Sequence, residues 1–260
     1  SNMYTYLKKN YLYIIFIILF SIINIYSIIS TLNANNITYN NKLLALIILI
    51  SYFIMIVFII FLNKFNKIKE EKLFLYLAIP IGLIYMVLIP VGLVPDEHTH
   101  FARAYEISEF HLVSDINTNG VGGRELPIEV NNNLMSEQSR DYKQYISNLT
   151  AKNSGKEDFI SFTNTALYNF ICYIPQSIGI LFGRIFQLPT LIDAYLGRVF
   201  NFALFILLIY LSIKLIPFMK KEILLLALLP MTMQEGISLS PDAMTIGCSF
   251  LLLSYVLYLK

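Results

Sequence analysis

Long apolar runs with few or no charged side chains constrain this chain more than any other feature of its sequence. A helix needs about 20 apolar residues to cross the roughly 30 Å of hydrocarbon in a bilayer. Apolar residues make up 57% of the chain and charged ones 14%, against roughly 45–50% and 25% in soluble domains. This balance excludes a disordered chain, a basic nucleic-acid-binding domain and an ordinary soluble enzyme. The runs are 11–32, 43–62, 73–94, 166–186, 191–216, 223–233 and 237–259.

Positive charges predict how these runs are oriented, because short loops rich in Lys and Arg stay in the cytoplasm. Keeping every lysine cluster on that side requires an even number of crossings between clusters. Three runs lie between Lys72 and Lys214, which is one too many. Run 166–186 is interrupted by Pro175 and Arg184, so we expect it to lie in the outer interface or to re-enter the membrane. A seven-span layout is the alternative. The clusters are Lys8 and Lys9; Lys64, Lys67, Lys69 and Lys72; Lys214, Lys220 and Lys221; and Lys260.

The resulting fold prediction is an all-α, polytopic helical membrane protein with six spans and both ends in the cytoplasm. Residues 1–94 would carry three spans, 95–190 a long extracytoplasmic loop with interfacial helices, and 191–260 three further spans. The loop holds 11 of the 17 acidic residues, which indicates a folded region in water. Run 223–233 is short, so its helix is expected to continue further. The glycine-rich stretch 120–124 is expected to be a turn, because no strand is predicted before it.

The residues that follow the third apolar run are dense in ionisable groups. Asp96, Glu97, His98, His100 and Arg103 stand close together where the chain is expected to leave the membrane on its outer side. If a helix begins at Asp96, the side chains of Asp96, His100 and Arg103 share one face. We expect this helix to lie on the membrane surface.

Structural roles account for part of this cluster. Asp96 follows a proline and suits a helix N-cap that accepts from free N–H groups, and Glu97 complements the helix dipole. Capping does not account for two histidines and an arginine at the same boundary, so a functional site is favoured. His98 and His100 point to different sides of a helix, and no third His or Cys is near, which disfavours a protein-only zinc site. A Mg²⁺ or Mn²⁺ ion shared with a phosphate stays open.

Further charged residues are expected on the same outer side. An arginine inside a span, such as Arg198, costs several kcal/mol unless paired or solvated, so it is a candidate site residue; snorkelling to headgroups is the alternative. Ser240 and Pro241 fit the N-cap and first position of the last helix. The carboxylate of Asp242 then either complements the helix dipole or belongs to a site. Arg184 is expected to meet lipid phosphate. Cys172 and Cys248 lie in apolar runs, which excludes a disulfide scaffold and a cysteine-ligated metal.

These residues carry a resemblance to a known family. The pattern Pro95-Asp96-Glu97-x-x-His100-Phe101-x-Arg103-Ala104 resembles the hallmark of domain-of-unknown-function family 2142, a group of bacterial membrane proteins. The resemblance covers roughly 73–260. Weaker motifs follow in the expected order: Gly122-Gly123-x-x-Leu126-Pro127, Tyr173-x-Pro175 with Gly179 and Gly183, Gly197-Arg198-x-x-Asn201, and Ser240-Pro241-Asp242.

That family is in turn similar to the GT-C class of integral membrane glycosyltransferases, which use polyprenyl-phosphate sugars as donors. The resemblance implies that Asp96 is the catalytic base, supported by Glu97. The side chains that would bind substrate, partly by facing the lipid phosphate, are His98, His100, Arg103, Arg198 and Asp242. Two departures from the class are the two spans before the motif and the end of the chain after six spans, so an acceptor-binding part is expected beyond these residues.

Two functions fit these residues. The first is a glycosyltransferase of the bacterial cytoplasmic membrane, whose partners are a lipid-linked sugar donor, an envelope glycan acceptor and membrane lipid, with no nucleic acid. The alternative is a non-enzymatic transporter or an envelope-polymer assembly protein. Charged residues deep within several spans would favour transport. The first three spans contain none, which argues against an ion pathway.

Overall fold

A computed structural model describes residues 68–136 and 141–259, together with the isolated positions 15, 22, 26, 29, 30 and 33. The chain divides into two compact units, Ser1–Lys67 and Ile68–Lys260, and all the elements below belong to the second. Apart from those isolated positions, the expected spans 11–32 and 43–62 lie outside the described residues.

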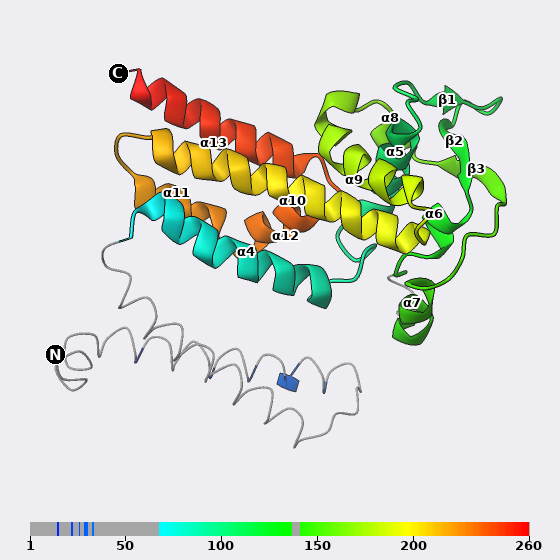
Figure 1. Ribbon diagram of the computed structural model, residues 1–260, viewed down its shortest axis with the longest axis horizontal. Helices are drawn as coiled ribbons and strands as arrows, with labels where there is room; N and C mark the ends of the chain where they lie inside the picture. Colours follow the sequence, from blue (N-terminus) through cyan, green and yellow to red (C-terminus); the bar gives the residue numbers. More distant parts are fainter. Residues whose placement is uncertain are drawn as a thin grey trace. The chain divides into compact units, whose positions relative to one another are not determined.

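Two long apolar helices form the centre of the second unit, α4 (Glu70–Leu88) and α10 (Thr190–Leu215). Their mean hydropathies are 1.7 and 2.0, so both are apolar and long enough to cross a membrane. At 1.5 Å per residue they are roughly 28 and 39 Å long. Helix α10 packs against α4, α9 (Ile174–Ile185) and α13 (Asp242–Tyr258) (Figure 1). The coarse prediction of a mostly helical protein with membrane-spanning helices is therefore supported, whereas the number of spans stays a prediction.

Apolar side chains fill the space between these helices. Phe74 of α4, Phe205 and Ile209 of α10, Met233 and Ala243 are all completely buried in one cluster, which we call the bundle core. At about 25 cal/mol per Å² of apolar area removed from water, each of the larger side chains contributes roughly 1.5–3 kcal/mol to this packing.

The sixth apolar run forms two short helices instead of the one continuous helix that we expected. Helix α11 (Lys220–Ala227) ends before Leu228, and α12 (Pro230–Ile237) begins with a proline. Proline has no N–H to donate and its ring clashes with the preceding turn, so it is favoured at the first position of a helix and disfavoured in the interior. The break lies at Leu228 and Leu229.

The region between α4 and α10 also contains strands, so the all-α prediction is wrong there. Strands β1 (Asp115–Ile116), β2 (Gly122–Pro127) and β3 (Glu157–Ser161) form an antiparallel sheet in the order β1-β2-β3. The expected turn at 120–124 is instead a turn followed by the start of β2. The side chain of Asn117 closes that turn by accepting from two main-chain N–H groups. At Gly123 a Cβ atom would overlap the main-chain oxygen of Ile160 on β3, so the strands meet through a glycine.

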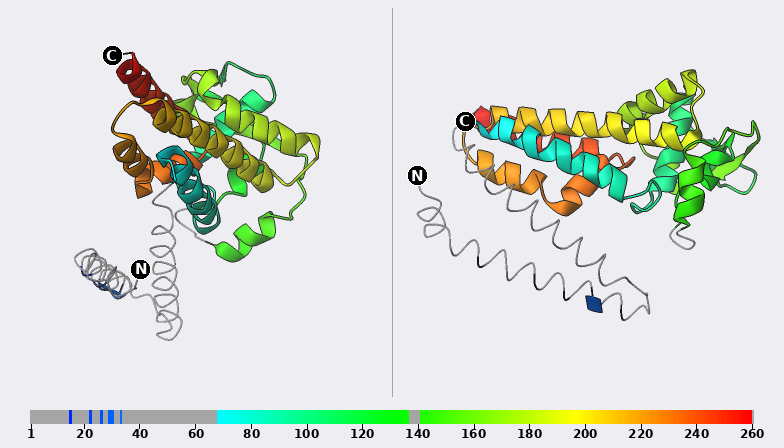
Figure 2. Two further views of the ribbon diagram at one scale, coloured as in Figure 1. Left: turned by 60° about the vertical axis from the view of Figure 1, so that its left-hand side comes forward. Right: turned by 60° about the horizontal axis from the view of Figure 1, so that its bottom comes forward.

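Helix α5 (Glu97–Ser108) is enclosed by protein, which contradicts the expectation that it lies on the membrane surface. Phe101, Ala104 and Tyr105 anchor a second apolar cluster, the α5 core, which also includes Leu126 of β2 and Tyr173. The polar residues of α5 suggested a surface helix, because the sequence does not show that they have partners. In the structure His100, Arg103 and Glu106 are buried and bond to other side chains. The short helices that pack against α5 are α6 (Glu129–Asn132), α8 (Thr163–Ala166), η1 (Phe170–Tyr173) and α9. Helix α7 (Tyr142–Asn148) lies in the same green part of the chain, which Figure 2 shows gathered at one end of the long helices.

Candidate functional site

A completely buried ion pair joins the two long helices to the start of α5. The guanidinium of Arg198 on α10 donates from Nε to Glu97 Oε1 (2.7 Å) and from Nη2 to Oε2 (2.6 Å), and neither side chain has any exposed surface. The same carboxylate accepts from the main-chain N–H groups of Gly92 (2.8 Å) and Leu239 (3.2 Å). A buried charge pair is costly unless its remaining hydrogen-bonding groups are satisfied, and here they are. Arg198 also donates to the main-chain oxygens of Ile89 (2.6 Å) and Pro90 (3.2 Å).

The turn between α12 and α13 is held by two side-chain amides from other helices. Asn201 on α10 donates to the main-chain oxygens of Ser238 (2.8 Å) and Ser240 (3.0 Å). Gln176 on α9 donates to those of Leu239 (3.3 Å) and Ser240 (3.2 Å). Together with the ion pair, these bonds bring α5, α9, α10 and the start of α13 to one place. Four motifs far apart in the sequence therefore meet.

The loop that leads from α4 into α5 is fixed just as firmly. The Tyr145 hydroxyl of α7 accepts from Val91 N (2.8 Å), and Val91 O accepts from Met135 N (2.8 Å). Gly92 adopts a φ of +101°, which side chains other than hydrogen disfavour. A Cβ atom there would also come too close to the main chain of Met135. The residues just before α5 therefore have little freedom.

Asp96 stands at the end of this loop in an unusual conformation. Its φ of +57° is left-handed, a state that costs a residue with a side chain on the order of 1–3 kcal/mol and often marks a functional position. Its main-chain oxygen accepts from the first turn of α5, but its exposed carboxylate makes no hydrogen bond with the described residues. The prediction that the Asp96 side chain caps the helix is thus wrong, because the left-handed turn directs the carboxylate away from the helix N–H groups.

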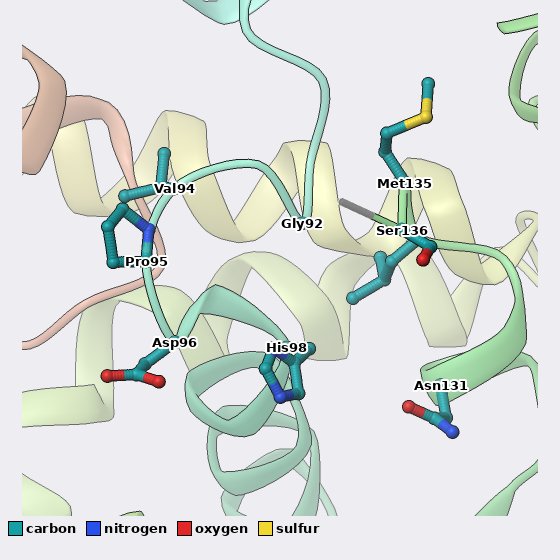
Figure 3. Close-up of a pocket in the computed structure, with 9 residues that line it drawn as sticks. Gly92, Val94, Pro95, Asp96, His98, Asn131, Met135 and Ser136 are labelled. Atoms are coloured by element: carbon teal, nitrogen blue, oxygen red, sulfur yellow. The ribbon is translucent and has the colours of Figure 1, made fainter. Parts of the chain in front are cut away.

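Asp96 and His98 line a cavity of about 420 Å³ beside the first turn of α5. Figure 3 shows both side chains on that turn, with Asn131 of α6 on the opposite wall. The remaining lining residues are Gly92, Val94, Pro95, Leu134, Met135 and Ser136. The cavity is open at the exposed Asp96 and His98, so a ligand could reach both side chains from outside.

His100 is buried on the other side of α5, where its Nδ1 lies 2.8 Å from the hydroxyl of Tyr173. Burial lowers the pKa of His100 below its usual value of 6.5, and the carboxylates of Asp242, Asp96 and Glu97 partly oppose that shift. The imidazole is therefore neutral at pH 7. Asp242 is the first residue of α13, directly after the turn that Asn201 and Gln176 hold, and it is not among the residues that line the cavity at Asp96.

The motifs that meet at this site lie within the part of the chain that matches the model of a known protein family. The model of domain-of-unknown-function family DUF2142, described as a predicted membrane protein, matches residues 81–259. The chain belongs to the DUF2142 family. Comparisons with curated proteins and with solved structures gave no match.

Arg103 of this DUF2142 protein lies away from the cavity. It forms an ion pair with the buried Glu106 and donates to the Ser114 hydroxyl (2.9 Å) and the Leu112 oxygen (2.9 Å). Glu106 is also bonded by Arg124 of β2 (2.8 Å). Only 2% of the Arg103 side chain is exposed, so its expected place facing a lipid phosphate is not what the geometry shows. Arg103 instead holds the segment just before β1 against α5, through Leu112 and Ser114.

Arg198, Arg184 and Ser240 also differ from their expected roles. Arg198 is enclosed with Glu97 and has no exposed surface to offer a phosphate. Arg184 donates to Glu109 (2.8 Å) and Ser108, so its expected contact with lipid phosphate is replaced by a protein contact. Helix α13 begins at Asp242 with Pro241 as its N-cap, one residue later than expected, and the Ser240 hydroxyl accepts from the Asp242 N–H (3.2 Å) without being the N-cap.

Several residues that shape the site had no role predicted from the sequence. Gln176 and Asn201 could have been found, because an amide in an apolar helix usually has a buried partner. Glu106, three residues after Arg103, carried the signal of an i, i+3 pair. Asn131 carried none, since only the fold brings it to the cavity. Among the described residues, no group of three or more His, Cys, Asp or Glu side chains is placed to hold a metal ion.

Proposed function

We propose that this DUF2142 protein is a glycosyltransferase, similar to the GT-C class, that moves a sugar from a polyprenyl-phosphate donor to an envelope glycan. The observation that carries the proposal is the Asp96 carboxylate, which is exposed, lacks a hydrogen-bond partner among the described residues and lines a cavity of about 420 Å³. Glu97 directly follows Asp96, and its buried ion pair with Arg198 holds the left-handed backbone of Asp96. A carboxylate kept free at the cost of strain suits a general base.

In the proposed sugar transfer each group has one role. The acceptor hydroxyl attacks the anomeric carbon of the donor sugar, and its proton passes to the Asp96 carboxylate. The bond from that carbon to the phosphate oxygen breaks, and polyprenyl phosphate leaves. His98 and Asn131, which line the cavity, are the groups we assign to the sugar phosphate. Arg103 and Arg198 are enclosed by their own partners, so in this proposal they position the site.

The membrane topology is part of the same proposal: six spans, both ends in the cytoplasm, and residues 95–190 outside. The lysines support it, because the start of α4, the end of α10 and the start of α11 lie at one end of the bundle (Figure 1), where Lys220 Nζ donates to the Lys214 oxygen (3.3 Å). At the other end, Arg198 joins the end of α4 to α5. This separation agrees with the positive-inside rule.

Cysteine labelling tests the topology. In a background with Cys172 and Cys248 replaced by Ser, we expect Glu125→Cys on β2 to react with a membrane-impermeant maleimide in intact cells. Lys221→Cys should react only after the membrane is permeabilised. Labelling of both positions from the same side would refute the six-span arrangement.

Sugar transfer tests the chemistry. Purified protein in lipid nanodiscs would be given radiolabelled polyprenyl-phosphate sugars and envelope glycan acceptors. Removing a general base typically lowers a rate by about 10²–10⁴-fold, and we expect that loss for Asp96→Asn. The matched control is Asp158→Asn on β3. Asp158 is exposed and does not line the cavity, so this change should leave the rate unchanged. Transfer by Asp96→Asn at the wild-type rate would remove Asp96 as the base, and movement of donor across liposomes without covalent change would favour a transporter.

A further inference from the structure

A second cavity, of about 490 Å³, lies where the turn between α9 and α10 meets the middle of α5. It shares no lining residue with the cavity at Asp96. Its walls come from three parts of the chain that are far apart in sequence. The lining residues are Tyr105, Lys152, Asn153, Arg184, Gln187, Leu188, Pro189 and Asp193.

Asp193, in the first turns of α10, is the residue in this cavity that the fold leaves unexplained. Its side chain is 1% exposed, and neither carboxylate oxygen has a hydrogen-bond partner among the described residues. Glu97 and Glu106, the comparable buried acids, each accept several hydrogen bonds. A buried acceptor left without a donor destabilises the folded state, and more so if it is charged. Such a group calls for a donor from outside the described fold.

A glycine makes room for this carboxylate. At Gly183 on α9, a Cβ atom would overlap Asp193 Oδ1, so any other residue would displace the carboxylate. Asn153, from the loop after α7, accepts from Thr190 N (3.2 Å) and Thr190 Oγ1 (2.8 Å) at the start of α10. The cavity is therefore built on a fixed helix start.

The other lining groups restrict the charge of the ligand. Arg184 is engaged by Glu109 and Ser108, and its guanidinium carbon lies 5.0 Å from the centre of the Tyr105 ring. An anion would have to lie against the acceptor oxygens of the buried Asp193 side chain, and a cation would face Arg184 and the exposed Lys152. An uncharged ligand rich in hydroxyl groups avoids both repulsions, since each hydroxyl can donate to a carboxylate and accept from an ammonium or amide.

We propose that this second cavity binds an uncharged sugar residue, whose hydroxyls donate to Asp193 and accept from Lys152 and Gln187. The apolar walls of Leu188 and Pro189 would meet the C–H face of the sugar ring. The proposal concerns binding alone and does not depend on the chemistry at Asp96. A chain that binds sugar here without transferring it would still satisfy it.

Saturation-transfer NMR on protein in lipid nanodiscs tests the proposal, since these contain no sugar detergent. The probes are the methyl glycosides of glucose, galactose, rhamnose and N-acetylglucosamine. We expect at least one of them to bind. An amide presents an NH₂ group in place of one acceptor oxygen, so Asp193→Asn should weaken binding by about tenfold. Lys152 is exposed, so Lys152→Ala should fold normally, and it should weaken binding by several fold.

Matched controls separate this site from the first. Asp158→Asn and Asp96→Asn should both bind the glycoside as the wild type does, even if Asp96→Asn abolishes transfer. Failure of all four glycosides to bind would overturn the proposal, as would unchanged affinity in both Asp193→Asn and Lys152→Ala. Loss of binding in Asp96→Asn alone would move the sugar to the first cavity and would also overturn it.

Discussion

Glu97→Gln is the sharpest test of how the site is held. The Glu97 carboxylate accepts four hydrogen bonds, two from Arg198 and one each from the main-chain N–H groups of Gly92 and Leu239. An amide keeps one oxygen and presents an NH₂ group to the remaining donors, and it leaves the buried Arg198 charge without its partner. Breaking a buried ion pair from one side costs about 3–5 kcal/mol. For a domain of 150–250 residues, about 2–4 °C per kcal/mol gives a fall in melting temperature of about 6–20 °C.

Circular dichroism at the helix band measures this change in lipid nanodiscs, because the chain has no tryptophan to report by fluorescence. The matched control is Glu109→Gln, which removes the partner of Arg184 where both side chains are partly exposed, 21% and 28%. That pair should contribute about 1 kcal/mol or less. The double variant Glu97→Leu with Arg198→Leu should recover part of the loss, since it leaves no unpaired charge. Equal melting temperatures for Glu97→Gln and Glu109→Gln would refute the central role of this ion pair.

Three other predictions concern the packing of α9 on α10, the strands β1 and β2, and pH. Gly179→Ala would place a Cβ atom against the main chain of Leu196, so overpacking should cost about 1–3 kcal/mol in thermal melts; unchanged stability would mean that α9 and α10 do not approach so closely. Glu106→Gln removes the carboxylate shared by two arginines, so hydrogen exchange should accelerate in β1 and β2 but not in α13, and uniform protection would contradict this. His100 should titrate below 6.5 by NMR, because burial lowers its pKa. Since its folded pKa is lower than its unfolded one, its contribution to stability is present above about pH 6.5 and is lost as the pH falls; a rise in stability on acidification through that range in the wild type but not in His100→Asn would refute it.

The long apolar helices could be predicted from the sequence because a single property, the length of an apolar run, decides them. Helix α10 begins and ends within one residue of run 191–216, whereas α4 begins three residues before run 73–94 and ends six residues before that run does. Pro230 could have predicted the break between α11 and α12, but the length of the apolar run alone does not indicate it. The sheet escaped prediction because β1 has two residues and β2 gives no regular alternation of burial.

Several residues of the site could be predicted from the sequence, but the ion-pair partners of its arginines could not. Asp96 was expected to be a functional carboxylate, and the structure leaves it free beside a cavity, which agrees with that role without testing it. Arg198 was placed at the site because an arginine inside a span needs a partner, and Arg103 because it shares a helix face with Asp96 and His100. Both arginines do have partners, but these are Glu106 and Glu97 of this chain. Sequence spacing cannot pair residues 97 and 198, because only the packing of α10 against its neighbours brings them together.

The turn before α13 is anchored by its main chain. Asn201 and Gln176 hold it through main-chain oxygens, and Glu97 holds it through the main-chain N–H of Leu239. Other helices thus hold this turn through its main chain, in addition to the hydrogen bonds that its own Ser238 and Ser240 hydroxyls make. Its tolerance to substitution should follow backbone chemistry: a proline at position 239 would remove the N–H that Glu97 requires, whereas an apolar residue of similar size would keep it.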